Sequence, residues 1–355
     1  MRSGAGLAAG LLAAGSLGAL SSCGVGSGYR AWWDQDKGAT ARPAGATDGG
    51  PARPADAAVE SGAKEAGPPP VEAAPPPTPI QTVFLVLMSR QPWSAVEGSA
   101  SAPYINGTLL PAGAHCLDYR AAPAKVAQSE PNAVWLEAGQ DFGFTSNAPP
   151  STDHTGSTRH LVDQLEAAGI SWKAYVEGTP AGSCPIDDAS PYRTFHVPFL
   201  FFDDVVGNPP STSAKRCVEH VVPFSRLATD LSSGQAPRYA FVVPDLCDDM
   251  HDDCNTGDPV NQGDTWLAAT VPGILGSTAY ATGGAVFIAW DFSPGAYDPI
   301  GFIALSAHAR PGFAGSVPLT HSSTLLSLQE IFGLTPPLGD AANATDLAGM
   351  FTSFP

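Results

Sequence analysis

The sequence predicts an α/β fold whose central, mostly parallel sheet carries helices on both faces. Continuous apolar runs of strand length, typical of strands buried in a parallel sheet, lie at 82–88, 239–243, 285–290 and 300–305. Helical periodicity lies between these runs at 159–168, and after them at 322–332. Glycine closes each of the two helical segments. Strands alternating with helices favour a covered sheet, and functional residues of such sheets gather at the carboxyl ends of the strands.

The first 23 residues are typical of a lipoprotein signal peptide. Arg2 gives a positive start, residues 7–20 are apolar, and Leu20-Ser21-Ser22-Cys23 has the form of a lipobox. The apolar segment is too short and too glycine-rich for a comfortable membrane span. We therefore expect export, lipid attachment at Cys23, and an anchor to the cell envelope at the outer membrane or cell surface.

Residues 24–79 are rich in alanine, proline and glycine and hold few large apolar side chains. Such a composition cannot form a core, so this segment is predicted to be a disordered tether. Residues 80–355 are long enough for one large α/β domain. We expect all of the chemistry to lie in this domain.

The acidic balance excludes one class of partner. The chain has 17 Lys and Arg against 34 Asp and Glu, a formal net charge of −17. Nucleic-acid binding needs clustered cations, and so does charge-driven docking to anionic lipid. Contact with a membrane is therefore expected only through the N-terminal lipid, while a small charged substrate remains compatible with the sequence.

Six cysteines occur in the chain. With Cys23 lipidated and the protein exported, disulfides are permitted among the rest. Cys247 with Cys254 is the best pair, and Cys184 with Cys217 is the natural second pair. Cys116 is then left over as a buried, apolar residue. No paired CxxC spacing indicates a cysteine zinc site.

The segment 244–254 holds five acidic residues and a histidine between a predicted strand and a predicted helix. Acidic clusters beside histidine suit binding of hard cations or proton transfer. A solvated acidic loop held by a disulfide has the same pattern. Composition alone leaves both interpretations open.

Several motifs in a fixed order resemble a known family. They are Ser129-Glu130-Pro131-Asn132, the segment 244–252 that contains Asp-Met-His-Asp, and Gly-Asp-Thr-Trp-Leu at 263–267. Weaker matches follow the same order at 102–106, 164–177, 196–199 and 320–322. The chain resembles the bacterial phosphoesterase family, which holds acid phosphatases and phospholipase C enzymes. The resemblance implies an alkaline-phosphatase-like core and hydrolysis of a small phosphoric ester.

The resemblance also implies roles for single residues. Ser129 falls on the family's nucleophile, just before a helix whose N–H groups suit phosphate, although the same position also suits a simple N-cap. Asn132 would donate to phosphate oxygens. His196 and His251 would serve the phosphate and the leaving group, although a histidine between apolar residues is often structural.

Two further residues are assigned to substrate binding by the same comparison. Asp252 would orient His251 or ligate a metal. His321 would contact substrate, although it could equally open the last helix.

The sequence departs from the family pattern at the positions where the family places its metal ligands. Glu and Asn of the family's first strand end are replaced by Ser89 and Arg90, and Glu of the late strand end is replaced by Phe292. Asp291 alone remains as a metal-side carboxylate, so any divalent metal site is expected to be incomplete. A guanidinium binds phosphate well, which suggests that Arg90 replaces part of the lost charge.

Two functions follow from these losses. The first is a serine-dependent hydrolase of phosphoric esters with altered chemistry. The second is a catalytically degenerate surface lipoprotein that keeps the fold as a binding module.

Overall fold

The computed structural model describes residues 79–122, 126–254 and 257–355. An eight-stranded sheet lies at its centre in the order β5-β4-β6-β1-β7-β8-β2-β9. Neighbouring strands from β5 to β7 in this order pair in parallel. Strand β8 is antiparallel to both of its neighbours, β7 and β2. The last pair, β2 and β9, is again parallel. The predicted α/β fold with a mostly parallel sheet is confirmed. The strands are β1 (Thr82–Met88), β2 (Ala114–Cys116), β4 (Trp172–Val176), β5 (Val221–Pro223), β6 (Tyr239–Val243), β7 (Gly284–Trp290), β8 (Phe302–Ser306) and β9 (Phe313–Gly315).

The predicted strands agree closely with the observed ones. β1 and β6 have the predicted bounds, and β7 begins one residue earlier. The fourth run, predicted at 300–305, forms β8 two residues later, because the Ile300 amide donates to the Tyr119 carbonyl instead of joining the main ladder. A two-stranded sheet of β3 (Tyr119–Arg120) and β10 (Leu319–Thr320) lies beside this point.

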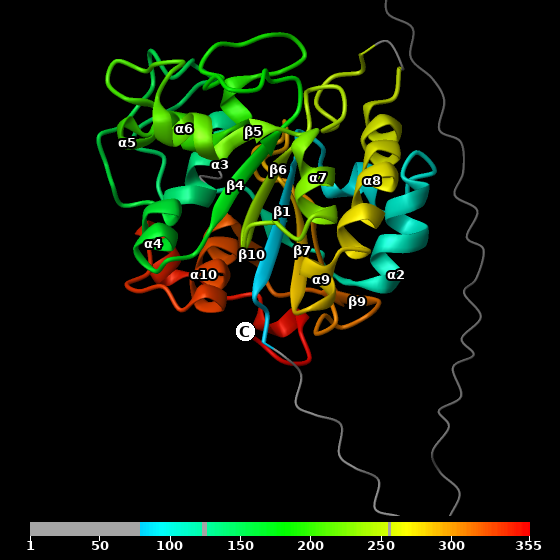
Figure 1. The fold of residues 1–355 in the computed structure, drawn as a ribbon. Helices are drawn as coiled ribbons and strands as arrows, with labels where there is room; N and C mark the ends of the chain where they lie inside the picture. Colours follow the sequence, from blue (N-terminus) through cyan, green and yellow to red (C-terminus); the bar gives the residue numbers. More distant parts are fainter. Residues whose placement is uncertain (1–78, 123–125, 255–256) are drawn as a thin grey trace, which may run out of the picture. The chain divides into compact units, whose positions relative to one another are not determined.

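Helices cover both faces of the sheet (Figure 1). On one side α3 (Ser129–Ala138), α4 (Leu161–Ala167) and α10 (His321–Phe332) pack together, and on the other α7 (Arg226–Ser232) packs against α8 (Pro259–Leu275). Central strands are buried along their whole length because helices cover both of their faces. The shorter helices are α1 (Trp93–Val96), α2 (Leu110–Ala112), α5 (Asp203–Val206), α6 (Lys215–His220) and α9 (Thr278–Ala281).

Glycine ends the helices that carry the site. Gly333 closes α10 and Gly139 closes α3, both in the left-handed region with φ of 66° and 67°. Gly139 has a second reason to lack a side chain, because a Cβ there would lie 2.5 Å from the Leu338 carbonyl oxygen. This contact ties the end of α3 to the C-terminal segment.

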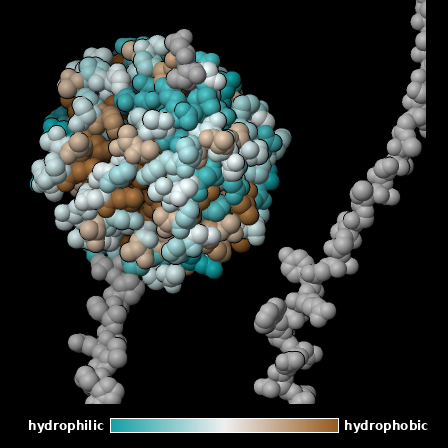
Figure 2. Space-filling view, turned by 90° about the vertical axis from the view of Figure 1, so that its right-hand side faces the viewer, coloured by the Kyte–Doolittle hydropathy of each residue, from teal (hydrophilic) through white to brown (hydrophobic). Residues whose placement is uncertain are grey.

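Both predicted disulfides are present, Cys184–Cys217 and Cys247–Cys254, and Cys116 is buried with a free thiol. The predicted signal peptide with Cys23, and all of the predicted tether except Pro79, lie outside the described residues. Within the described ranges, no helix has the length and apolar character needed to cross a membrane. Figure 2 shows the face that carries α8, where hydrophilic and hydrophobic residues are interspersed.

Candidate active site

Three adjacent strands end at the same edge of the sheet and place polar residues there. Ser89 directly follows β1, Asp291 directly follows β7, and Asp249 lies in the loop after β6. The loop is held close, because the Ser89 amide donates to the Asp249 carbonyl oxygen at 2.8 Å. All three side chains are buried. The expectation that site residues gather at carboxyl strand ends is met.

Ser129 is the first residue of α3 and does not act as its cap. Gln128 occupies the N-cap position, and no side chain caps this helix. The Ser129 hydroxyl instead lies 2.9 Å from His196 Nε2 and is fully buried. The simple N-cap interpretation of Ser129 is therefore wrong, and its hydroxyl is committed to a histidine.

His196 lies between two carboxylates. A short 3-10 turn, Thr194–His196, presents the ring, whose Nδ1 is 2.9 Å from Asp249 Oδ2. Its Nε2, which also faces Ser129, is 3.3 Å from Asp291 Oδ2. Burial alone would lower the pKa of His196, but Asp249 and Asp291 outweigh it and raise the pKa to about 10. The imidazole is therefore a cation at neutral pH.

The two carboxylates respond differently to the same histidine. Burial raises the pKa of Asp249 despite its pairing with His196. Burial acts in the same direction on Asp291, but hydrogen bonds from His196 and Ser129 hold its pKa below the usual value. Asp291 is thus the more firmly ionised partner.

The sequence motif contained Asp249, but its partnership with His196 was not predicted. Its orientation depends on Met250, which adopts φ of 77°, a left-handed conformation unusual for a residue with a side chain. That kink lets the His251 amide donate to Asp249 Oδ1 at 2.7 Å. A backbone conformation of this kind leaves no signal in the composition of the loop.

His251 lies beside His196, with ring centroids 5.9 Å apart. Its Nδ1 is 2.8 Å from Asp252 Oδ1. This contact is compatible with the first of the two roles predicted for Asp252, which is to orient His251. His251 is only partly buried, unlike His196. This places His251 at the rim of the cluster.

Arg90 reaches the cluster through its backbone. Its amide donates to Asp291 Oδ1 at 3.2 Å, while the residue itself is exposed and has φ of 65°. The guanidinium therefore does not fill the position of a metal. It remains available at the exposed edge of the site.

The side-chain amide of Asn132 does not have the orientation needed for its predicted role, which was to donate to phosphate oxygens. Its Nδ2 donates to the carbonyl oxygens of Val126 at 2.8 Å and Gln128 at 2.7 Å. Because both partners are acceptors, the amide nitrogen must face them, and only Oδ1 is left over. Asn132 therefore anchors the segment before α3, and the structure gives it no N–H group for phosphate.

His321 is also structural. It is fully buried at the start of α10, with Nε2 3.1 Å from the Trp290 carbonyl oxygen and Nδ1 3.2 Å from the Ala122 amide nitrogen. Burial lowers the pKa of His321, so the ring is neutral and bridges two backbone segments. The prediction that it contacts substrate is not supported, since both ring nitrogens are engaged.

The residues around Asp291 do not fit a divalent metal. Its Oδ1 accepts from the amides of Arg90 and Phe292, at 3.2 and 2.7 Å, and its Oδ2 accepts from the Ser89 hydroxyl at 3.1 Å. Ser89 and Phe292 stand where the family resemblance expects carboxylates. That the metal site is incomplete stays a prediction, and the donor set around Asp291 is compatible with it.

Two other groups have the spacing of metal ligands within the described ranges, His160–Asp163–Asp204 and Glu177–Asp245–Asp248. The first already contains a cation, because Arg216 contacts Asp163 at 2.6 Å and Asp204 at 2.5 Å. The second consists of carboxylates alone. Neither contains Asp291, so neither completes the site beside Ser129.

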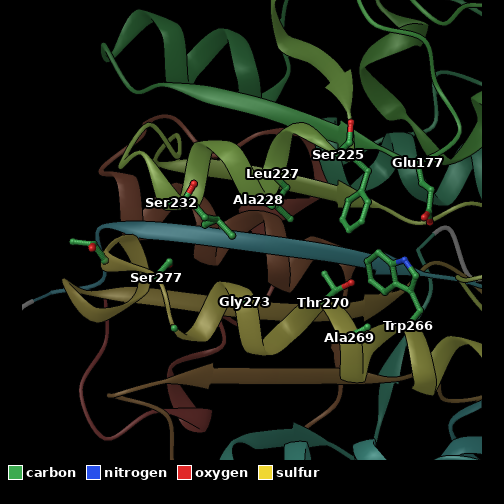
Figure 3. Close-up of a pocket in the computed structure, with 14 residues that line it drawn as sticks. Glu177, Ser225, Leu227, Ala228, Ser232, Trp266, Ala269, Thr270, Gly273 and Ser277 are labelled. Atoms are coloured by element: carbon green, nitrogen blue, oxygen red, sulfur yellow. The ribbon is translucent and has the colours of Figure 1, made fainter.

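A cavity of about 770 Å³ lies between α7 and α8 (Figure 3). Its walls are mostly apolar or small, with Leu227 on one side and Gly273 on the other. Glu177 and Trp266 lie together toward one end and Ser277 toward the other. None of the residues that line it belongs to the cluster around Ser129, so size alone does not identify the reactive site.

The sheet, with a buried serine and a clamped histidine at its carboxyl edge, defines an α/β enzyme of the hydrolase class. The Phosphoesterase family model matches residues 120–301. The chain is 31% identical over 271 residues to a phosphatidylinositol-3-phosphatase of Mycobacterium tuberculosis, covering 75% of this chain and 82% of that protein. The chain therefore belongs to the Phosphoesterase family, a group of phosphoric ester hydrolases.

The chain is also similar to a second curated protein and to solved structures. An acid phosphatase of Aspergillus fumigatus is 25% identical over 224 residues, covering 59% of this chain and 47% of that protein. A solved structure from work on glycosaminoglycan metabolism in Bacteroides thetaiotaomicron has a TM-score of 0.51 at 10% identity, covering 77% of this chain and 82% of that one. A protein in the alkaline phosphatase superfamily from Vibrio parahaemolyticus has a TM-score of 0.49 at 10% identity, covering 73% and 69%.

Proposed function

We propose that the protein hydrolyses a small phosphoric ester with Ser129 as the nucleophile. The observation that carries this proposal is the 2.9 Å contact between Ser129 Oγ and His196 Nε2 at the start of α3. A hydroxyl beside a cation and a helix N-terminus is well placed to attack phosphorus, because both stabilise the negative oxygens that develop. The names of the relatives, acid phosphatase and phosphatidylinositol-3-phosphatase, support this chemistry.

The remaining residues have supporting roles in this proposal. His251 protonates the leaving alcohol from the rim, oriented by Asp252 at 2.8 Å. Arg90 offers its exposed guanidinium to phosphate oxygens. A phosphomonoester is favoured over a phospholipid, because the net charge of −17 disfavours docking to an anionic bilayer.

Hydrolysis of p-nitrophenyl phosphate by the purified full chain tests the role of Ser129. Ser129→Ala removes the nucleophile, so turnover should fall by about 1000-fold or more. Ser213→Ala, at an exposed serine, is the matched control and should keep full activity. Equal activity in the two variants would exclude Ser129 as the nucleophile.

A binding module is the second candidate function. The replacement of carboxylates by Ser89 and Phe292, together with the complete burial of Ser129, favours it. The two candidates separate in the same assay. A folded wild-type chain that turns over no phosphomonoester under any condition would support the module.

We also propose that the chain is exported and anchored to the cell envelope by a lipid on Cys23. The lipobox and the two disulfides of the folded part support this location. Fractionation of cells tests it, since Cys23→Ala should move the protein from the membrane fraction to the soluble one. An unchanged distribution would exclude the lipid anchor.

A further inference from the structure

Asp291 has no oxygen left for an ion. A carboxylate offers about four acceptor positions. Those of Asp291 face the amides of Arg90 and Phe292, the Ser89 hydroxyl and His196 Nε2, all within 3.3 Å. A metal ion would have to displace several of these partners, two of which are fixed backbone amides.

The second buried carboxylate, Asp249, has fewer partners, because its Oδ2 forms no hydrogen bond and makes only an ion-pair contact with His196. Asp249 Oδ1 accepts from the His251 amide at 2.7 Å, and its Oδ2 faces His196 Nδ1 at 2.9 Å. A divalent ion bound by oxygen ligands needs six or more of them. The residues at the other two expected positions are a neutral hydroxyl at Ser89 and a buried ring at Phe292, 6% exposed.

His196 occupies the position between the Ser129 hydroxyl and Asp291. Its Nε2 is 2.9 Å from the Ser129 hydroxyl and 3.3 Å from Asp291 Oδ2, so a single atom faces the nucleophile and the carboxylate together. The orientation of the His196 ring is fixed from two sides. Asp249 contacts its Nδ1, and the Phe195 ring packs against the imidazole with centroids 4.7 Å apart.

We propose that this site transfers phosphoryl groups without a divalent metal, with His196, clamped by Asp249 and Asp291, in place of the ion beside Ser129. The inference rests on the proposed function. In the first half-reaction the Oγ–P bond forms while the ester P–O bond breaks, and the leaving alcohol gains the proton that Ser129 loses. In the second, water bonds to phosphorus, the Oγ–P bond breaks, and one water proton returns to Ser129.

The first experiment measures p-nitrophenyl phosphate hydrolysis by the full chain before and after treatment with EDTA. We expect turnover to change by less than twofold. Loss of turnover with EDTA and its recovery with an added divalent ion would overturn the metal-free site and leave the proposed function intact. No turnover with or without any added ion would instead overturn the proposed function on which the inference rests.

The second experiment measures metal binding directly and does not depend on activity. Titration calorimetry with Mn²⁺ compares the wild type with Asp291→Asn and with Ser89→Glu/Phe292→Glu, which restores the two expected carboxylates. Asp291→Asn should titrate like the wild type, while the double variant should gain one ion. Binding in the wild type that Asp291→Asn abolishes would overturn the proposal.

Discussion

Helix α3 meets a buried histidine near each of its ends, and the two histidines differ in what else they contact. Ser129 at the first residue contacts His196, and Glu137 near the last contacts His160, with Oε1 and Nδ1 3.0 Å apart. Each ring is clamped between carboxylates. Burial alone would lower the pKa of His160 too, but Asp163, Asp204 and Glu137 raise it to about 11.

The surroundings of His160 are closed. Its Nε2 lies 3.2 Å from Asp163 Oδ2 and 3.3 Å from Asp204 Oδ2, and its ring stacks on Phe202 with centroids 4.0 Å apart. Arg216 adds a second cation to this cluster from outside by pairing with Asp163 and Asp204. Every partner of His160 is therefore an ion or a ring, and none of them is a nucleophile.

The surroundings of His196 include a hydroxyl at a helix N-terminus, that of Ser129, which lies 2.9 Å from its Nε2. A buried histidine with a raised pKa is thus not in itself a sign of catalysis, since ion-pair networks produce the same shift. The hydroxyl at a helix N-terminus distinguishes the two clusters. His160 belongs to an ion-pair network alone, whereas the proposed function assigns His196 to the reaction because it contacts Ser129.

Exchanging each histidine for glutamine gives the largest contrast. His196→Gln should lower turnover by about 100- to 10,000-fold, because it removes the charged partner of Ser129. His160→Gln leaves the buried Glu137 without its partner, so it should destabilise the fold by about 3 kcal/mol or more while the folded fraction stays active. Denaturant unfolding and p-nitrophenyl phosphate hydrolysis, measured on both variants, separate the effects. The reverse pattern would mean that the assignments are exchanged.

Replacing a carboxylate beside each histidine should change turnover less than replacing the histidine itself. Asp249→Asn keeps the shape of the side chain and removes the charge that holds His196 Nδ1 at 2.9 Å. Hydrogen bonds to charged groups contribute about 1.5–3 kcal/mol, so kcat should fall roughly 10- to 100-fold with little change in KM. Asp163→Asn is the matched change beside His160 and should leave kcat unaltered. Equal kcat values for Asp249→Asn and the wild type would remove Asp249 from the positioning role.

The third prediction concerns the pH dependence of stability. The pKa of His196 is raised to about 10 and that of His160 to about 11, so both rings hold protons in the folded chain that the unfolded chain loses above its ordinary value of 6.5. Their stabilisation is complete below pH 6.5 and is lost as the pH rises toward 10. The Tm should therefore fall steadily between pH 6.5 and 9.5.

A buried carboxyl group also bears on this profile. The pKa of buried Glu130 is raised to about 9, mainly by burial, so its ionisation also disfavours the fold as the pH rises. The depressed pKa of Asp204, about 2, concerns only acid conditions. In His160→Gln the fall of Tm between pH 6.5 and 9.5 should be shallower than in the wild type. A Tm that rises over this range in the wild type would contradict the assigned charge states.

Most of the fold was predictable, because continuous apolar runs and glycine-closed helices follow local rules. The same holds for the disulfides, whose spacing suggested the pairs. The site was predictable only as far as resemblance extended. Ser129, His196 and His251 lie together as expected, but resemblance could not show that Asn132 and His321 are turned toward backbone partners.

The role of Asp249 was missed for a physical reason. Its orientation depends on a left-handed Met250 and on a loop that returns to the end of β1, where the Ser89 amide binds its carbonyl oxygen. The second of these is a contact between segments about 160 residues apart. The pattern of a single sequence indicates helical or strand periodicity and local turns, but it does not indicate backbone contacts between distant segments.

The Cys247–Cys254 bond encloses the whole loop that supplies Asp249, His251 and Asp252. The enzyme therefore couples the arrangement of its reactive groups to the oxidation state of its surroundings. A newly made chain with reduced thiols lacks the bond that closes this loop, so its clamp on His196 is looser.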